Sequence, residues 1–124
     1  MTRPKISAAE WQVMNFLWDH SPAGSAEVVE HLQESTDWKP KTIKTLLARL
    51  VKKGFLTTEQ LGNRYQYRAA NSRQEAIQTE SSSFLSRVFK GDTASLLLHF
   101  ARSTELSEQD RQELRRLLEP QEEK

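Results

Sequence analysis

A β-hairpin pattern that directly follows three amphipathic helical patterns limits the fold of this 124-residue sequence more than any other feature. Two short segments rich in Thr, Phe and Tyr, residues 55–60 and 65–68, flank a turn at Gly62-Asn63. An all-helical bundle would leave this hairpin unexplained. The sequence therefore predicts a mainly α fold with a small β-hairpin.

The three helices that precede the hairpin have recognisable ends. The first begins with a capping box over Ser7–Glu10, and we expect Ser25 to cap a second, shorter helix. The third is expected to begin at Pro40, because the N–H that proline lacks would have no partner there. Gly54 supplies its left-handed C-cap. Three helices followed by a hairpin predict a winged helix-turn-helix domain over residues 1–71.

The net charge of +1 conceals a concentration of basic side chains in one part of the chain. Residues 36–68 carry eight basic and two acidic side chains, a net charge of +6, whereas the segments before and after them carry −3 and −2. Such a basic block is typical of a protein with a polyanionic partner. Charge alone also allows an ordinary solvated face.

The third helix separates its apolar residues from its basic residues. On a helical wheel its apolar residues share one face, which must lie toward the core: Ile43, Leu46, Leu47 and Leu50. The positions opposite this face carry basic, hydroxyl or alanine side chains and no acidic one, whereas ordinary exposed helices mix both signs. A helix in the major groove needs cations for phosphates and short side chains for base edges.

We therefore expect these outward residues, together with one at the hairpin tip, to contact DNA: Lys39, Lys41, Thr42, Lys44, Thr45, Arg49, Lys52 and Arg64. Thr45 and Arg49 are the expected base contacts, and Lys41, Lys44 and Lys52 are expected on phosphates. Taken singly, Arg64 could equally be a solvated turn residue. Tyr65 and Tyr67 alternate with Gln66, so both are expected to pack on the inner face of the hairpin.

The remaining residues, 72–124, are expected to form helices, with a capping box over Ser72–Glu75, a break at Gly91-Asp92 and a last helix after Leu106-Ser107. Their apolar stripes either fold back on the first domain or pair with a second copy. Pairing is favoured, because major-groove readers gain specificity by spanning two half-sites about 34 Å apart. The expected dimerisation residues are Phe84, Leu85, Val88, Phe89, Leu96, Leu97, Phe100, Leu114, Leu117 and Leu118.

Several classes of function are excluded or disfavoured. The absence of cysteine excludes disulfides and thiolate sites, and His20, His31 and His99 lack ligand spacing, so neither a metal nor another cofactor is expected. No catalytic triad, phosphate loop or carboxylate pair has a recognisable spacing, so we expect no enzyme. Without a signal peptide or a long apolar stretch, we expect a cytoplasmic protein with no membrane insertion.

Four segments resemble the BlaI/MecI/CopY penicillinase-repressor family over about Ile6 to Leu118: ISAAEWQVMNFLW, WKPKTIKTLLARLVKKGFL, NRYQYR and VFKGDTASLLLHFA. The resemblance implies a cytoplasmic homodimer that binds a palindromic operator and represses transcription. In the β-lactam-resistance branch, a membrane sensor metalloprotease triggers cleavage of the repressor in its dimerisation part. The corresponding bond here is His99-Phe100, where relatives have Asn-Phe.

Two alternatives to this function remain. The copper-responsive branch uses a cysteine cluster that this chain lacks, but a repressor of an unrelated operon, released by a ligand, would share the fold. A winged-helix protein-interaction module would bind no DNA, and we would expect mixed or apolar chemistry on the outward face of its third helix.

Overall fold

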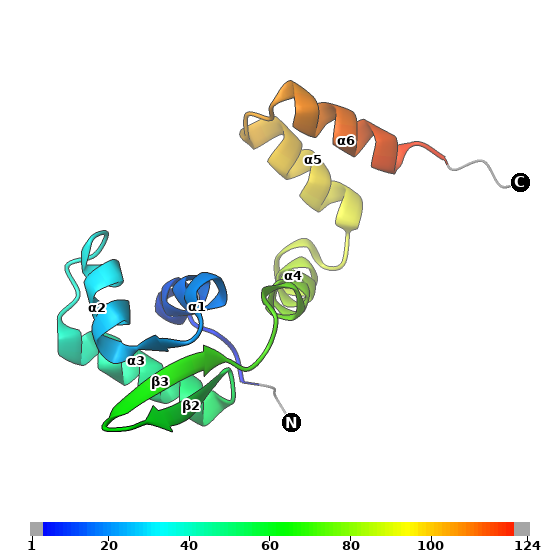
Figure 1. Ribbon diagram of the computed structural model, residues 1–124. Helices are drawn as coiled ribbons and strands as arrows, with labels where there is room; N and C mark the ends of the chain where they lie inside the picture. Colours follow the sequence, from blue (N-terminus) through cyan, green and yellow to red (C-terminus); the bar gives the residue numbers. More distant parts are fainter. Residues whose placement is uncertain (1–3, 121–124) are drawn as a thin grey trace, which may run out of the picture. The chain divides into compact units, whose positions relative to one another are not determined.

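The computed structural model describes residues 4–120, which form two compact units, one ending at Glu80 and one beginning at Ser81. Three helices, a two-residue strand and a hairpin make up most of the first unit (Figure 1). In chain order they are α1 (Ala8–His20), β1 (Ala23–Gly24), α2 (Ser25–Gln33), α3 (Pro40–Lys53), β2 (Leu56–Leu61) and β3 (Arg64–Ala69). This confirms the predicted mainly α fold with a hairpin.

The helix ends follow the predicted capping chemistry with one exception. At the start of α1, Ser7 Oγ accepts a hydrogen bond from the Glu10 N–H, and Glu10 Oε1 accepts one from the Ser7 N–H. The prediction that Ser25 caps α2 is wrong by one residue. Gly24, the last residue of β1, holds the extended N-cap conformation, and its N–H donates to Glu27 Oε1 at 3.3 Å.

Helix α3 begins and ends where the sequence predicts. Pro40 is its first residue, and Gly54 adopts the left-handed conformation with φ of 90°. The N–H of Phe55 then bonds to the carbonyl of Leu50, which turns the chain sharply into the hairpin. The position of α3 relative to the hairpin is therefore fixed by its own C-cap.

The core of the first unit lies between the helices and the base of the hairpin. The four predicted core residues of α3 are at most 5% exposed, and they pack with buried side chains from α1, α2 and β2. Those partners include Val13, Met14, Leu17, Val28, Leu32 and Leu56. Because its apolar face is held here, α3 presents its opposite face to solvent.

The sheet has three antiparallel strands in the order β1-β3-β2, with β1 pairing through Ala23 to Tyr67 and through Gly24 to Gln66. Two residues are too few to leave a strand pattern, so β1 was not predicted. Tyr67 packs against the core as expected, but Tyr65 is 59% exposed, so that part of the prediction is wrong. Tyr65 lies beyond the end of β1, where the hairpin projects from the helices.

The second unit contains the end of α4 (Arg73–Phe89), which crosses the boundary between the units, and α5 (Thr93–Ser103) and α6 (Glu108–Leu118). Asp92 and Ser107 cap α5 and α6 through their side chains, as the predicted breaks require. The ring of Phe84 lies 5.9 Å from that of Phe89 and 6.5 Å from that of Phe100. The domain boundary after residue 71 stays a prediction.

No helix within residues 4–120 combines the length and the apolar character that crossing a membrane requires.

Candidate nucleic-acid interface

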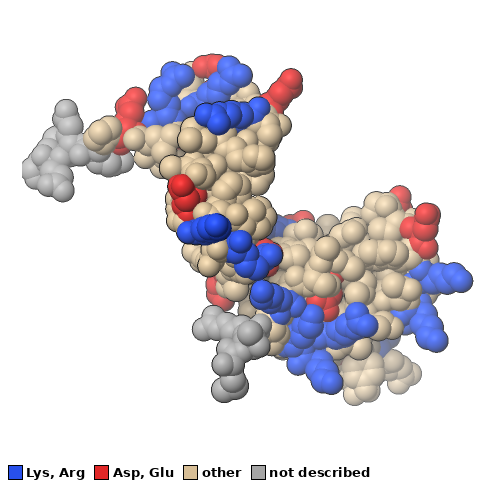
Figure 2. Space-filling view, turned by 180° about the vertical axis from the view of Figure 1, so that it is seen from behind, with Lys and Arg blue, Asp and Glu red and all other residues tan. Residues whose placement is uncertain are grey.

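All eight predicted DNA-contacting residues are exposed, seven along or just before α3 and Arg64 at the hairpin tip. Six of them are cations, and within residues 4–120 none of the six forms an ion pair: Lys39, Lys41, Lys44, Arg49, Lys52 and Arg64. Lys and Arg side chains follow one another along the lower edge of the first unit in Figure 2. We call Lys39, Lys41, Lys44, Arg49, Lys52 and Arg64 the cationic face.

Thr45 has less hydrogen-bonding freedom than the sequence suggests. Its hydroxyl donates to the carbonyl of Lys41 at 2.9 Å, one turn earlier in α3. In this state the hydroxyl oxygen can still accept a hydrogen bond, and the methyl group can contact a thymine methyl. Thr45 therefore suits a base amino group or a methyl, whereas Arg49 supplies donors.

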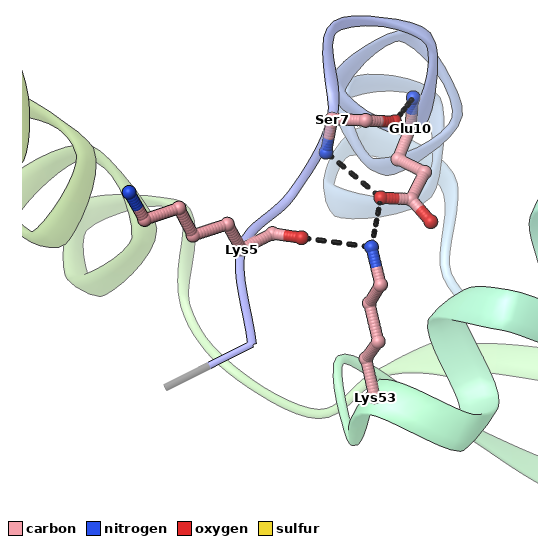
Figure 3. A network of polar contacts seen from close by, with 4 residues as sticks. All are labelled: Lys5, Ser7, Glu10 and Lys53. Carbon is pink, nitrogen blue, oxygen red and sulfur yellow. Dashed lines mark hydrogen bonds and ion pairs between the residues drawn. The ribbon is translucent and has the colours of Figure 1, made fainter. Parts of the chain in front are cut away.

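Lys53 belongs to the basic block by sequence, yet its charge is used inside the first unit (Figure 3). Its Nζ donates to Glu10 Oε1 at 2.6 Å and to the carbonyl of Lys5 at 2.8 Å. The side chain of Glu10 is 1% exposed, and its Oε2 is buried without a hydrogen-bond partner. This network joins the start of α1 to the last turn of α3.

The ionisation of Glu10 depends on this network. Burial alone would raise the pKa of the Glu10 carboxyl, but the hydrogen bonds from Lys53 and Ser7 outweigh it and lower the pKa below its ordinary value. The sequence contains a signal for this site. Glu10 shares the helical face of Val13, Met14 and Leu17, where a carboxylate requires a buried partner.

The hairpin contributes unequally to the cationic face. Arg64 is exposed next to the turn, whereas Arg68 lies 3.9 Å from Glu59 on the neighbouring strand, with both side chains about half exposed. Arg68 is thus partly neutralised by its neighbour. Leu61 and Tyr65 are also more than half exposed near the tip, which adds apolar area beside Arg64.

The histidines contact other aromatic rings. His20 and His31, from α1 and α2, lie against Phe16, with ring centroids 4.8 and 4.4 Å from it. Within residues 4–120 no group of three or more His, Asp or Glu side chains is placed to hold a metal ion. The contacts of His20 and His31 with Phe16 are ordinary aromatic packing.

The predicted dimerisation residues remain accessible to solvent in the single chain. None of the side chains of α5 or α6 is buried, and Leu117 and Leu118 are 64% and 67% exposed. Leu97 and Phe100 on α5 are 41% and 45% exposed. The His99-Phe100 bond lies inside α5, with helix on both sides of it.

Known proteins resemble this chain over nearly its whole length. The family model described as penicillinase repressor matches residues 6–120. The methicillin resistance regulatory protein MecI of Mammaliicoccus sciuri is 38% identical over 114 residues, covering 92% of this chain and 93% of its own. The penicillinase repressor of Bacillus licheniformis is 38% identical over 116 residues, covering 94% and 91%.

A solved structure resembles part of this chain. It is the solution structure of the monomeric form of Bacillus licheniformis BlaI in complex with the blaP half-operator, which is 38% identical in sequence. The TM-score is 0.53, and the match covers 60% of this chain and 90% of the other. The family match over nearly the whole chain, together with these relatives, establishes the family of this chain. The chain belongs to the penicillinase repressor family, whose members are transcriptional repressors and not enzymes.

Proposed function

We propose that this chain is a homodimeric transcriptional repressor that inserts α3 into the major groove of a palindromic operator. The observation that carries the proposal is the cationic face. Its six cations form no ion pair within residues 4–120, and five of them lie on or just before α3, a helix whose opposite face is buried. The half-operator complex of a 38% identical relative supports DNA as the partner. A repressor acts where the DNA is, so we place the protein in the cytoplasm.

The chemistry of the cationic face suggests a division of roles. Lys39, Lys41, Lys44 and Lys52 carry compact charges that suit phosphates, which fix the position of a protein on DNA without reading its sequence. Arg49 can donate two parallel hydrogen bonds to the O6 and N7 atoms of guanine. We assign Arg49 and Thr45 to base edges and Arg64 to a neighbouring phosphate. Thr42 is assigned to the edge of the contact between α3 and the DNA.

The same proposal gives the second unit the role of dimerisation. Apolar side chains that remain exposed on both of its short terminal helices are typical of a surface that is covered by a partner. A second copy is the natural partner, because two linked winged helices match the two halves of a palindrome. The surface comprises the predicted set of Phe84, Leu85, Val88, Phe89, Leu96, Leu97, Phe100, Leu114, Leu117 and Leu118.

The proposal also includes a mechanism by which the repressor is released from the operator. Cleavage at His99-Phe100 by a sensor-controlled protease would remove α6 and the end of α5, and with them much of the dimerisation surface. Because that bond lies within a helix, a protease needs α5 to unwind locally before it can cut. Release by a ligand that binds the intact dimer is the alternative, and no described residue specifically favours it.

A binding experiment with Arg49→Ala tests the proposed interface. Gel shifts compare a duplex from the DNA upstream of the gene with a random duplex of the same length. We expect Arg49→Ala to cost about 1–3 kcal/mol on the upstream duplex and much less on random DNA. The control is Arg111→Ala on α6, which removes the same charge from a residue paired with Glu108. Equal losses on both duplexes would make Arg49 a phosphate contact, and no binding by the wild type would refute the proposal.

A further inference from the structure

Arg73, the first residue of α4, makes an unusual set of contacts with α1. Its Nη2 donates to the carbonyl of Asn15 at 3.1 Å and lies 3.0 Å from Asp19 Oδ1. Its guanidinium carbon lies 5.5 Å from the centroid of the Trp18 ring. One side chain thus contacts a carbonyl, a carboxylate and an aromatic ring on a single helix, three interactions that a planar guanidinium can combine.

The chain just before Arg73 is held to the same helix. Trp18 Nε1 donates to the carbonyl of Asn71 at 2.8 Å, and the Ala70 N–H donates to the carbonyl of Phe55 at 2.9 Å. Ser72 Oγ then accepts from the Glu75 N–H and starts α4. The connection between β3 and α4 therefore has little freedom, and we call these contacts of Trp18 and Arg73 the α1–α4 clamp.

The ion pair in the α1–α4 clamp contributes little to the stability of the fold. The side chains of Arg73 and Asp19 are 40% and 57% exposed, so their ion pair is screened by solvent and adds little to folding. Several directional contacts instead hold the first residue of α4 and the chain just before it against α1. Because α4 continues into the second unit, its direction at this point influences where a dimer would place its two winged helices.

We propose that Arg73 is a positioning residue that selects the spacing between operator half-sites by fixing the direction in which α4 leaves α1. The inference rests on the proposed function, since it requires a dimer on a palindrome. One added base pair moves a half-site by about 3.4 Å and rotates it by about 35° around the DNA axis. A rigid clamp therefore makes binding sensitive to single base-pair changes, and a loosened one tolerates them.

The test measures affinity against half-site spacing. Duplexes selected by the wild-type chain from a random pool supply a palindrome, its isolated half-site, and versions with one or two base pairs added or removed at the centre. Fluorescence anisotropy measures the Kd of the full-length wild type, Arg73→Ala and Arg73→Lys on each duplex. The control is Arg111→Ala, which removes the same charge from α6 at a residue paired with Glu108 of its own helix.

We expect Arg73→Ala to bind the isolated half-site within threefold of the wild type, which also shows that the winged helix is folded. On the palindrome it should bind at least tenfold more weakly, because poorly aligned heads lose part of the roughly 10²–10⁴-fold gain of two linked sites. Its affinities for the altered spacings should differ less than those of the wild type. Arg73→Lys should fall between them, and Arg111→Ala should match the wild type.

Two results would overturn this inference while leaving the proposed function intact. One is an Arg73→Ala protein with the wild-type spacing preference, and the other is an equal loss on half-site and palindrome, which would place the effect within one winged helix. A wild type that binds the palindrome no more tightly than the half-site would contradict the proposed function, and this inference with it.

Discussion

Substitution of Lys53 by Met should destabilise the first unit far more than a surface substitution does. It removes the partner of a carboxylate that is 1% exposed and has one oxygen already without a hydrogen bond. Removing one partner of a fully buried pair costs about 3–5 kcal/mol, and because Lys53 is 31% exposed we expect about 2–3 kcal/mol. Glu10→Gln keeps the shape and the accepting Oε1, so it should cost only about 1 kcal/mol.

Urea unfolding followed by tryptophan fluorescence measures these costs, since all three tryptophans, Trp11, Trp18 and Trp38, lie in the first unit. Protein concentration is held constant because a dimer would make stability depend on it. The matched control is Lys52→Met, an identical change at an exposed neighbour that makes no ion pair within residues 4–120, expected within about 0.5 kcal/mol of the wild type. If Lys53→Met cost no more than Lys52→Met, or if the Glu10→Gln/Lys53→Met double-mutant cycle showed no coupling, the reasoning would be refuted.

Three further predictions follow from the same structure. Affinity for operator DNA should fall by about 10³–10⁵ between 50 and 200 mM salt, because the cationic faces of a dimer neutralise roughly 6–10 phosphates; gel shifts with no salt dependence would contradict this. A chain truncated after His99 should sediment as a monomer and bind the operator about 10²–10⁴-fold more weakly, whereas a truncated dimer with normal affinity would exclude cleavage there as the release mechanism. The lowered pKa of Glu10 contributes stability that is complete above its ordinary value of 4.5 and is lost as pH falls through the folded-state value, so the stability advantage of the wild type over Glu10→Gln should shrink in acid.

The helices and the hairpin were predictable because each has a local signal in the sequence. Capping at Ser7, Pro40 at the first position of α3 and Gly54 at its end depend on neighbouring residues alone. The outward face of α3 followed from helical periodicity, and every residue expected on it is exposed. These features needed no knowledge of what the chain packs against.

The errors and omissions concern contacts between distant parts of the chain. Strand β1 exists only because β3 pairs with it, at Ala23 and Tyr67, which lie 44 residues apart in the chain. Where β1 ends also decides that Tyr67 is covered and Tyr65 is not. The ion pair of Glu10 with Lys53 and the α1–α4 clamp are likewise set by tertiary packing, which no short stretch of sequence encodes.

Footprinting of the purified chain on the DNA upstream of its own gene tests the central claim most directly. We expect a protected sequence with twofold symmetry, whose half-sites are centred about 10 base pairs or a multiple of that apart, and loss of protection with Arg49→Ala. Protection without symmetry would contradict binding by a dimer. Protection that appears only at concentrations where random DNA is equally covered would contradict the claim that this chain is an operator-specific repressor.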